Sequence, residues 1–250
     1  MDIYTPAILV ILGFVPSLAW LTFYLKKDPH PEPKYLISRT FLLGIVMAPL
    51  AIAMQWWFRS AALGLWPGYE IQTSVWFFLW AAAVEEVIKF LVVYFAVLRD
   101  PEFDEPTDAM IYMISAGLGF AAIENILVLF QAIPNGANTA VQIWLLRFVG
   151  ATLLHAVASA TVGYFLALAW FYSHHRKKLI MSGIGIATLL HLVFNITLLS
   201  GNGKPEGFVF STAFLILIAA IISFLFARLR KLETGNERVA VDNQHLPQTN

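Results

Sequence analysis

Runs of about 20 mostly apolar residues recur along this chain, and they constrain its fold more than any other feature. A helix needs about this length to cross a bilayer, where only helices and closed barrels satisfy all backbone hydrogen bonds. A window of about 20 residues finds seven candidate spans, at residues 6–25, 38–58, 74–98, 108–131, 148–172, 179–200 and 208–228. The sequence therefore predicts an all-α, polytopic membrane bundle of about seven transmembrane helices.

The composition supports a membrane location and excludes several function classes. Hydrophobic residues make up 59% of the 250 residues and charged residues 13%, with a mean hydropathy of +0.71, values that do not describe a soluble domain. The net charge of zero supplies no basic field, so no nucleic-acid partner is expected. Because the chain has no cysteine, any catalysis must use oxygen or nitrogen groups, or a metal that they hold.

The Lys and Arg residues predict the orientation, because cytoplasmic loops collect positive charge. With the N-terminus outside, twelve of the sixteen basic residues fall on the cytoplasmic side, whereas Arg59 and Lys204 fall outside. The cytoplasmic set is Lys26, Lys27, Lys34, Arg39, Arg99, Arg176, Lys177, Lys178, Arg228, Arg230, Lys231 and Arg238. We expect residues 1–229 to form the integral membrane domain. The polar residues 230–250 are expected to form a disordered cytoplasmic tail.

Ionisable and amide side chains inside the apolar runs are the strongest pointers to function. Each ionisable group at mid-membrane costs about 2.5 to 3.5 kcal/mol, so each needs a reason. Glu85 and Lys89 stand four residues apart, which predicts an ion pair, whereas Glu86 points about 100° away. The full set is Glu85, Glu86 and Lys89 in the third span, Glu124 and Asn125 in the fourth, His155 in the fifth, and His191 and Asn195 in the sixth.

These polar groups are expected to share one depth in the bilayer. At a rise of 1.5 Å per residue along alternating helices, they all lie between mid-membrane and the outer surface, within about 10 Å of one another in depth. Unrelated structural side chains would have no reason to share a level. The preceding stretch 139–147 is either an interfacial helix or an extension of the fifth span. Its Arg147 either meets the outer headgroups or closes the polar site.

Four motifs carry a family resemblance: Glu85-Glu86-x-x-Lys89, Phe120-x-x-x-Glu124-Asn125, His155 among small residues, and His191-x-x-x-Asn195. In this order the chain resembles the PrsW family of intramembrane proteases, within the wider CAAX-protease and bacteriocin-processing superfamily, over about residues 26–195. Relatives that process prenylated proteins carry His at the position of Glu124 and commonly Arg near that of Lys89. Since this chain departs from them at both positions, a prenylated substrate is not expected.

The resemblance implies a multi-pass protease of the cell membrane that cuts membrane-anchored proteins within or at the edge of the lipid bilayer. The family is typified by a member that makes the first, extracytoplasmic-side cut in a membrane-bound anti-sigma factor, a step of regulated proteolysis. A transmembrane or juxtamembrane protein is therefore the expected substrate.

Two versions of the chemistry stay open. In both, Glu85 or Glu86 acts as general base on water, the other glutamate and Lys89 hold geometry and charge, and Asn195 and one histidine donate hydrogen bonds to the oxyanion. In the metal version, Glu124, His155 and His191 bind zinc and leave a fourth position to water. In the metal-free version, a glutamate activates water directly and the histidines are only donors.

Two other function classes compete with a protease. An ion-coupled transporter also buries carboxylates and histidines, but the sequence shows no internal repeat and few Gly or Pro near mid-membrane. A pseudoprotease that binds membrane proteins without cutting them would keep its function after Glu85→Gln or Glu86→Gln.

Overall fold

The computed structural model describes residues 5–28, 30–200 and 205–244, and within these ranges it is a bundle of eight α-helices without strands. The helices are α1 (Thr5–Leu25), α2 (Lys34–Leu65), α3 (Val75–Ala96), α4 (Asp108–Ala132), α5 (Ala137–Val149), α6 (Ala151–Phe171), α7 (Arg176–Ser200) and α8 (Pro205–Gln244). Short 3₁₀ turns lie at Ile71–Thr73, Ile133–Asn135 and Ser173–His175. The predicted all-α membrane bundle is confirmed.

Seven passes account for these helices. Six segments are long and apolar enough to cross a bilayer: α1, α2, α4, α7, α8, and the consecutive pair α5 and α6. The seventh, α3, has 22 residues but carries three charged side chains. The helix is interrupted at Gly150, between α5 and α6, so the stretch around residues 139–147 belongs to a separate helix within the fifth pass.

The last helix is longer than the predicted span. The sequence predicts a disordered tail from residue 230, whereas α8 continues as one helix to Gln244, and residues 245–250 lie outside the described residues. The division into a membrane domain and a tail stays a prediction.

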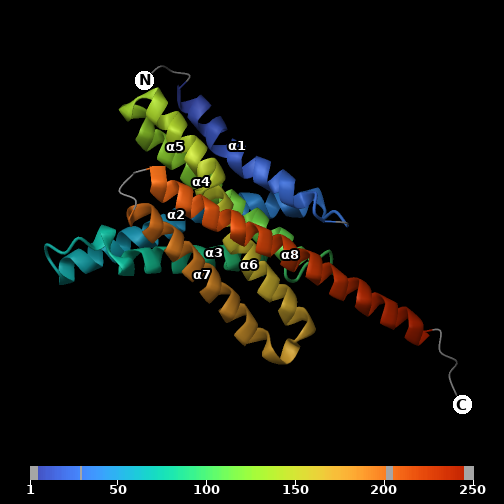
Figure 1. Cartoon of the computed structure of the whole chain (residues 1–250). Helices are drawn as coiled ribbons and strands as arrows, with labels where there is room; N and C mark the ends of the chain where they lie inside the picture. Colours follow the sequence, from blue (N-terminus) through green and yellow to red (C-terminus); the bar gives the residue numbers. More distant parts are fainter. Residues whose placement is uncertain (1–4, 29, 201–204, 245–250) are drawn as a thin grey trace, which may run out of the picture.

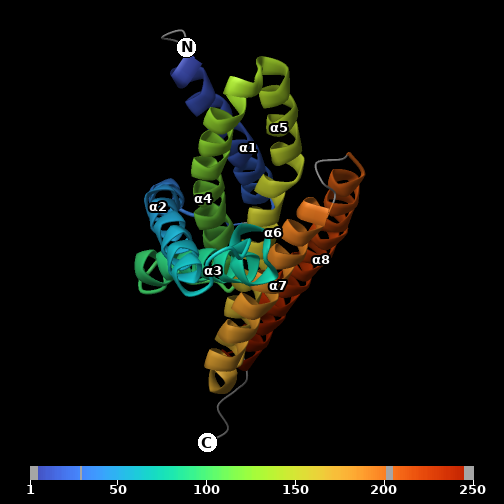
Figure 2. The same cartoon turned by 90° about the vertical axis from the view of Figure 1, so that its left-hand side faces the viewer.

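Helices α4 and α6 form the centre of the bundle and are buried along most of their length (Figures 1 and 2). Helices α1 and α2 pack against α4, whereas α7 and α8 pack against α6. Helix α3 lies between α2 and α7. The outer helices expose large apolar side chains, as expected for surfaces that face lipid. Figure 1 shows the connected ends of α2 and α3 projecting from one side of the bundle.

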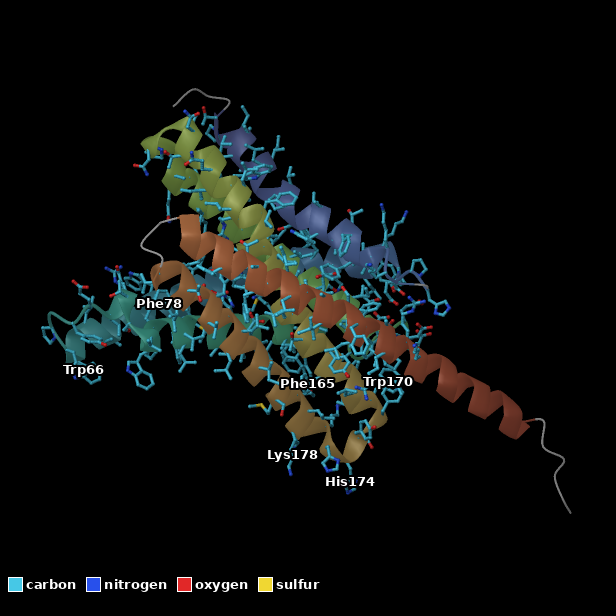
Figure 3. The ribbon with its side chains drawn as sticks, viewed as in Figure 1. Trp66, Phe78, Phe165, Trp170, His174 and Lys178 are labelled. Atoms are coloured by element: carbon cyan, nitrogen blue, oxygen red, sulfur yellow. The ribbon has the colours of Figure 1, made fainter. Side chains whose placement is uncertain are left out.

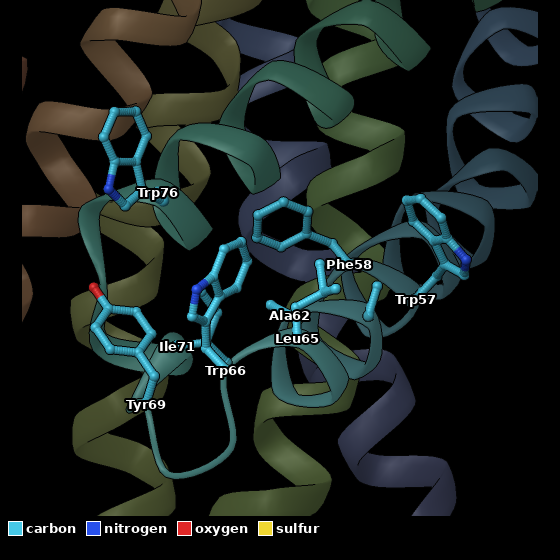
Figure 4. Close-up of a pocket in the computed structure, with 9 residues that line it drawn as sticks. Trp57, Phe58, Ala62, Leu65, Trp66, Tyr69, Ile71 and Trp76 are labelled. Carbon is cyan, nitrogen blue, oxygen red and sulfur yellow. The ribbon is translucent and has the colours of Figure 1, made fainter.

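The two ends of the molecule differ in chemistry. Figure 3 shows Trp66 at the projecting α2–α3 turn and His174 and Lys178 at the distant turn between α6 and α7. At the α2–α3 end, aromatic side chains including Trp57, Trp66 and Trp76 line an apolar cavity of about 600 Å³ (Figure 4). Aromatic side chains occur at both membrane interfaces, whereas Lys and Arg concentrate on the cytoplasmic side, so the basic α6–α7 turn is the end that the sequence predicts to be cytoplasmic.

Glycines let the central helices approach closely. A Cβ added at Gly117 of α4 would lie 2.9 Å from the carbonyl oxygen of His155 and 2.9 Å from the Cβ of Ser159, both on α6. A Cβ at Gly119 would meet the carbonyl group of Phe41 on α2. These contacts confirm that the small residues before Glu124 bring neighbouring helices together.

A polar junction joins the two loops that flank α2 and α3, which the sequence predicts to be cytoplasmic. The Tyr112 hydroxyl of α4 donates a hydrogen bond to Glu32 in the first loop, and His30 of that loop lies 2.8 Å from Glu105 in the second. Asp28 accepts a hydrogen bond from the backbone N–H of His30 at 3.0 Å. Asp28 is buried, and this burial raises its pKa to about 6.

Candidate active site

Six of the seven predicted catalytic residues meet at the centre of the bundle, where α3, α4, α6 and α7 approach one another. Helix α3 supplies Glu85, Glu86 and Lys89, and the other three helices supply Glu124, His155 and His191. All but Glu124 are buried, and the convergence follows from the common depth that the sequence predicts. Asn195 lies one turn beyond His191, is only partly buried, and makes no hydrogen bond with the described residues.

The Lys89 ammonium is the central cation of this cluster. Its Nζ lies 2.8 Å from Glu86 Oε1 and 2.7 Å from His155 Nδ1, and the side chain is fully buried. Glu85, the partner expected from the sequence, is farther away at 3.9 Å. Both spacings, three and four residues, make neighbours on a helix, and the long lysine side chain takes the nearer carboxylate.

The two histidines are oriented by their charged neighbours. His191 Nδ1 lies 3.0 Å from Glu86 Oε1, which leaves Nε2 to face Glu85 Oε2 at 3.7 Å. A carboxylate that accepts from one imidazole nitrogen and frees the other is the usual arrangement behind a metal-binding histidine. The His155 ring stands edge-on to the His191 ring at a centroid distance of 5.3 Å. An ammonium has no lone pair, so His155 Nδ1 accepts from Lys89.

Two side chains outside the predicted catalytic set also reach the site. Gln55 of α2 donates from Nε2 to Glu85 Oε1 at 2.9 Å, and its signal was a lone amide inside an apolar run. Arg147 of α5 donates from Nε to Asn125 Oδ1 at 2.7 Å and from Nη2 to Glu124 Oε2 at 3.2 Å. Of the two positions that the sequence left open for Arg147, the structure places it at the site.

Each of the three carboxylates has one oxygen held by the protein and one without a hydrogen bond to the described residues. Gln55 holds one oxygen of Glu85, and Lys89 and His191 hold one of Glu86. The second oxygen of each is buried without a hydrogen bond, although that of Glu85 lies within 4 Å of both Lys89 and His191. Buried carboxylate oxygens are costly when unpaired, so these atoms are suited to a cation or a water molecule.

The geometry selects a set of possible metal ligands that differs from the predicted one. Glu85, His155 and His191 each offer one ligand atom, and these atoms lie within 4.8 Å of one another. The sequence predicts Glu124 in place of Glu85, but in the structure Glu124 Oε2 lies 3.0 Å from His155 Nε2 and outside that group. Two nitrogens and one carboxylate oxygen are a donor set that zinc accepts in catalytic sites.

Comparison with known proteins places these observations in a family. A family model described as PrsW family intramembrane metalloprotease matches residues 32–225. "Protease PrsW" of Geobacillus kaustophilus is 34% identical over 193 residues, which cover 77% of this chain and 80% of the relative. The Oceanobacillus iheyensis protein of the same name is 31% identical over 92% of this chain and 97% of the relative. The Bacillus subtilis protein of that name is 31% identical over 73% of this chain and 79% of the relative. The search of solved structures finds no match.

Proposed function

The chain belongs to the PrsW family of intramembrane metalloproteases and is a multi-pass protease of the cell membrane; from this premise we propose that Glu85, His155 and His191 hold a catalytic zinc ion. The observation that carries the proposal is the convergence of these three donors in the buried centre of the bundle. Three protein ligands that leave one position to water are the arrangement of catalytic rather than structural zinc. When bound, zinc supplies polarisation of the scissile carbonyl and activation of a water molecule.

Glu86 and Lys89 are the groups that hold this arrangement. Glu86 accepts from both Lys89 and His191 and is fully buried, so it fixes which nitrogen of His191 faces Glu85. Lys89 offsets part of the negative charge and donates to His155 Nδ1, so the proton of His155 lies on Nε2, which faces Glu124. A zinc ion held by His155 Nδ1 would take the place of this Lys89 contact and keep the contact with Glu124.

Glu124 is our choice for the general base. Its side chain is 23% exposed, against 7% for Glu85 and none for Glu86, so it is the carboxylate that substrate and water reach. Its Oε2 is held by His155 and Arg147, whereas Oε1 has no hydrogen bond to the described residues. This oxygen takes a proton from the attacking water and returns it to the amide nitrogen as the C–N bond breaks.

Asn195 is proposed as a donor to the oxyanion. It lies one helical turn after His191 on α7, and its amide is not engaged by any described residue. A side-chain amide donor aimed at the developing negative charge is worth about 10² to 10³ in rate.

The proposed substrate is a membrane-anchored protein, cut within or next to its membrane-spanning segment on the outer side. The depth of the site supports this side, because Glu124, His155 and His191 lie within the predicted outer halves of α4, α6 and α7. Glu85 lies at the middle of α3. Regulatory single-span proteins of the anti-sigma-factor type have this form. The departures from the prenyl-processing relatives at Glu124 and Lys89 argue against a prenylated substrate.

The test uses the protein in detergent with a panel of single-span peptides that carry a fluorophore and a quencher around their outer juxtamembrane residues. We expect cleavage by the wild type and by Glu70→Gln, an exposed control in the α2–α3 turn, and at least 100-fold slower cleavage by Glu85→Gln, His191→Ala and Glu124→Gln. Zinc measured by mass spectrometry should be lost from the first two of these three variants only.

Three outcomes would redirect the proposal. Full activity in folded protein shown to be free of metal would remove zinc and favour direct activation of water by a glutamate. A folded wild type that binds these peptides but cuts none would favour a pseudoprotease. Zinc loss from Glu124→Gln but not from Glu85→Gln would restore the ligand set predicted from the sequence.

A further inference from the structure

The Arg147 side chain joins the one accessible carboxylate of the site to a structural network. Its guanidinium donates to Glu124 Oε2 at 3.2 Å and to Asn125 Oδ1 at 2.7 Å, so the two planar donors span adjacent residues of α4. Asn125 is buried and in turn donates to Thr152 Oγ1 of α6 at 3.0 Å. A guanidinium that binds two oxygens at once fixes their direction as well as their distance.

The helix that carries Arg147 is itself held in place. The Trp144 indole of α5 donates to the backbone carbonyl of Leu12 at 2.7 Å, and the Trp20 indole of α1 donates to that of Phe148 at 2.8 Å. These two hydrogen bonds flank Arg147 and tie the last turn of α5 to α1. The guanidinium therefore reaches Glu124 from a fixed support, not from a loop.

We propose that Arg147 is a positioning residue of the protease, which holds Glu124 in the orientation that presents its free oxygen to the attacking water. This inference rests on the role proposed above for Glu124. His155 and Arg147 contact the same oxygen, Oε2, so together they fix the carboxylate plane and leave Oε1 without a hydrogen bond to the described residues. Neither contact alone would prevent rotation about the last side-chain bond.

Charge gives a second, independent reason for a cation at this place. The site contains three carboxylates, those of Glu85, Glu86 and Glu124. Among the described residues, only two Lys or Arg side chains contact them, Lys89 and Arg147. Lys89 is fully buried beside Glu86 and His155 on the far side of the His155 ring from Glu124. Arg147 thus supplies, beside Glu124, the positive charge that Lys89 cannot supply there.

The test compares Arg147→Met and Arg147→Lys with the wild type on a quenched single-span peptide that the wild type cuts. Positioning predicts that Arg147→Met lowers kcat by about 10- to 100-fold with KM within about twofold. Lysine keeps the charge but cannot span both oxygens, so Arg147→Lys should recover part of the rate. Arg176→Met is the matched control, because Arg176 is exposed at the α6–α7 turn, at the far end of α7 from the site, and its kcat and KM should equal those of the wild type.

A double-mutant cycle with Glu124→Asp separates positioning from a purely structural role. The shorter carboxylate cannot hold the native contact, so Arg147→Met should cost much less in this background than in the wild type. Equal losses in both backgrounds, a change confined to KM, or a wild-type rate in Arg147→Met would overturn the inference. Bound zinc in Arg147→Met should stay at the wild-type level, and its loss would assign Arg147 to the metal site instead.

The proposed role of Glu124 as general base is tested separately from the role of Arg147. If Glu124→Gln cuts as fast as the wild type, Glu124 is not the base, whatever Arg147→Met does. If Glu124→Gln is inactive while Arg147→Met is fully active, the proposed function stands and the positioning role is wrong.

Discussion

Replacing Gly117 with alanine should impair the site without touching any polar residue. The added Cβ would lie 2.9 Å from the His155 carbonyl oxygen and 2.9 Å from the Ser159 Cβ, whereas ordinary contacts of these atoms begin near 3.4 Å. Helices α4 and α6 must therefore separate by about 0.5 to 1 Å. The same movement lengthens the 3.0 Å contact between Glu124 and His155 beyond hydrogen-bonding distance.

Two magnitudes follow from this separation. Overpacking of a tight interface costs about 1 to 3 kcal/mol in unfolding free energy, partly offset by the better helix propensity of alanine, about 1 kcal/mol. A displacement of about 1 Å between catalytic groups can cost about 100-fold in rate, so we expect a loss of 10- to 100-fold in kcat. The activity should therefore fall much more than the stability.

The assay measures peptide cleavage and thermal unfolding of the same detergent preparation. Gly185→Ala on α7 is the control, because a Cβ at Gly185 meets no atom within 4 Å, and it should leave both measurements unchanged. Adding Ser159→Gly to Gly117→Ala removes the clashes with the Ser159 Oγ and Cβ, leaves the clash with the His155 carbonyl oxygen, and should restore part of the rate. If Gly117→Ala matches Gly185→Ala in rate and stability, the close approach of α4 and α6 does not position the site.

Three further predictions concern metal, charge and pH. Removal of zinc by a chelator should abolish cleavage, and zinc alone should restore it in the wild type but not in Glu85→Gln; recovery in that variant would exclude Glu85 as a ligand. Lys89→Met should lower the unfolding free energy by about 3 to 5 kcal/mol, because it leaves Glu86 buried without its cation. Adding Glu86→Gln should recover much of this loss. A wild-type melting temperature in Lys89→Met would contradict the ion pair. Burial raises the pKa of Asp28 to about 6, from about 3.9 in the unfolded chain. The folded state therefore binds the Asp28 proton more tightly, and the resulting contribution to the unfolding free energy is complete below pH 4 and is lost as the pH rises through about 6. Asp28→Asn should therefore melt like the wild type at pH 4 and at a higher temperature at pH 7.5, and an equal difference at both values would refute the assignment.

The fold class and most of the site were predictable because lipid makes exceptions visible. Apolar runs of spanning length define the passes, and any charged residue inside them is expensive enough to mark a site. Glu85, Glu86, Glu124, His155 and His191 stand out in this way, and the helical rise alone predicts that they share a depth. The structure adds which atoms meet.

The parts that could not be predicted depend on helix rotation and on side-chain reach. Periodicity cannot tell which of two adjacent glutamates faces Lys89, and the structure pairs it with Glu86 at 2.8 Å. Rotation also puts Glu85 in the possible ligand group in place of Glu124. Arg147 was ambiguous because a basic residue near a span end suits the headgroups equally well, and only the packing of α5 on α1 and α4 directs it inward.

The distribution of the site over the bundle has a consequence for biosynthesis. Its groups come from every helix from α2 to α7, and His191 is the last of those that contact one another to be made. A chain that has inserted only its first five passes lacks this imidazole, and Glu86 lacks one of its two partners. If His191 is a zinc ligand, as proposed, the enzyme would not cut neighbouring membrane proteins while it is still being translated, and its proteolytic activity would begin only when the sixth pass joins the bundle.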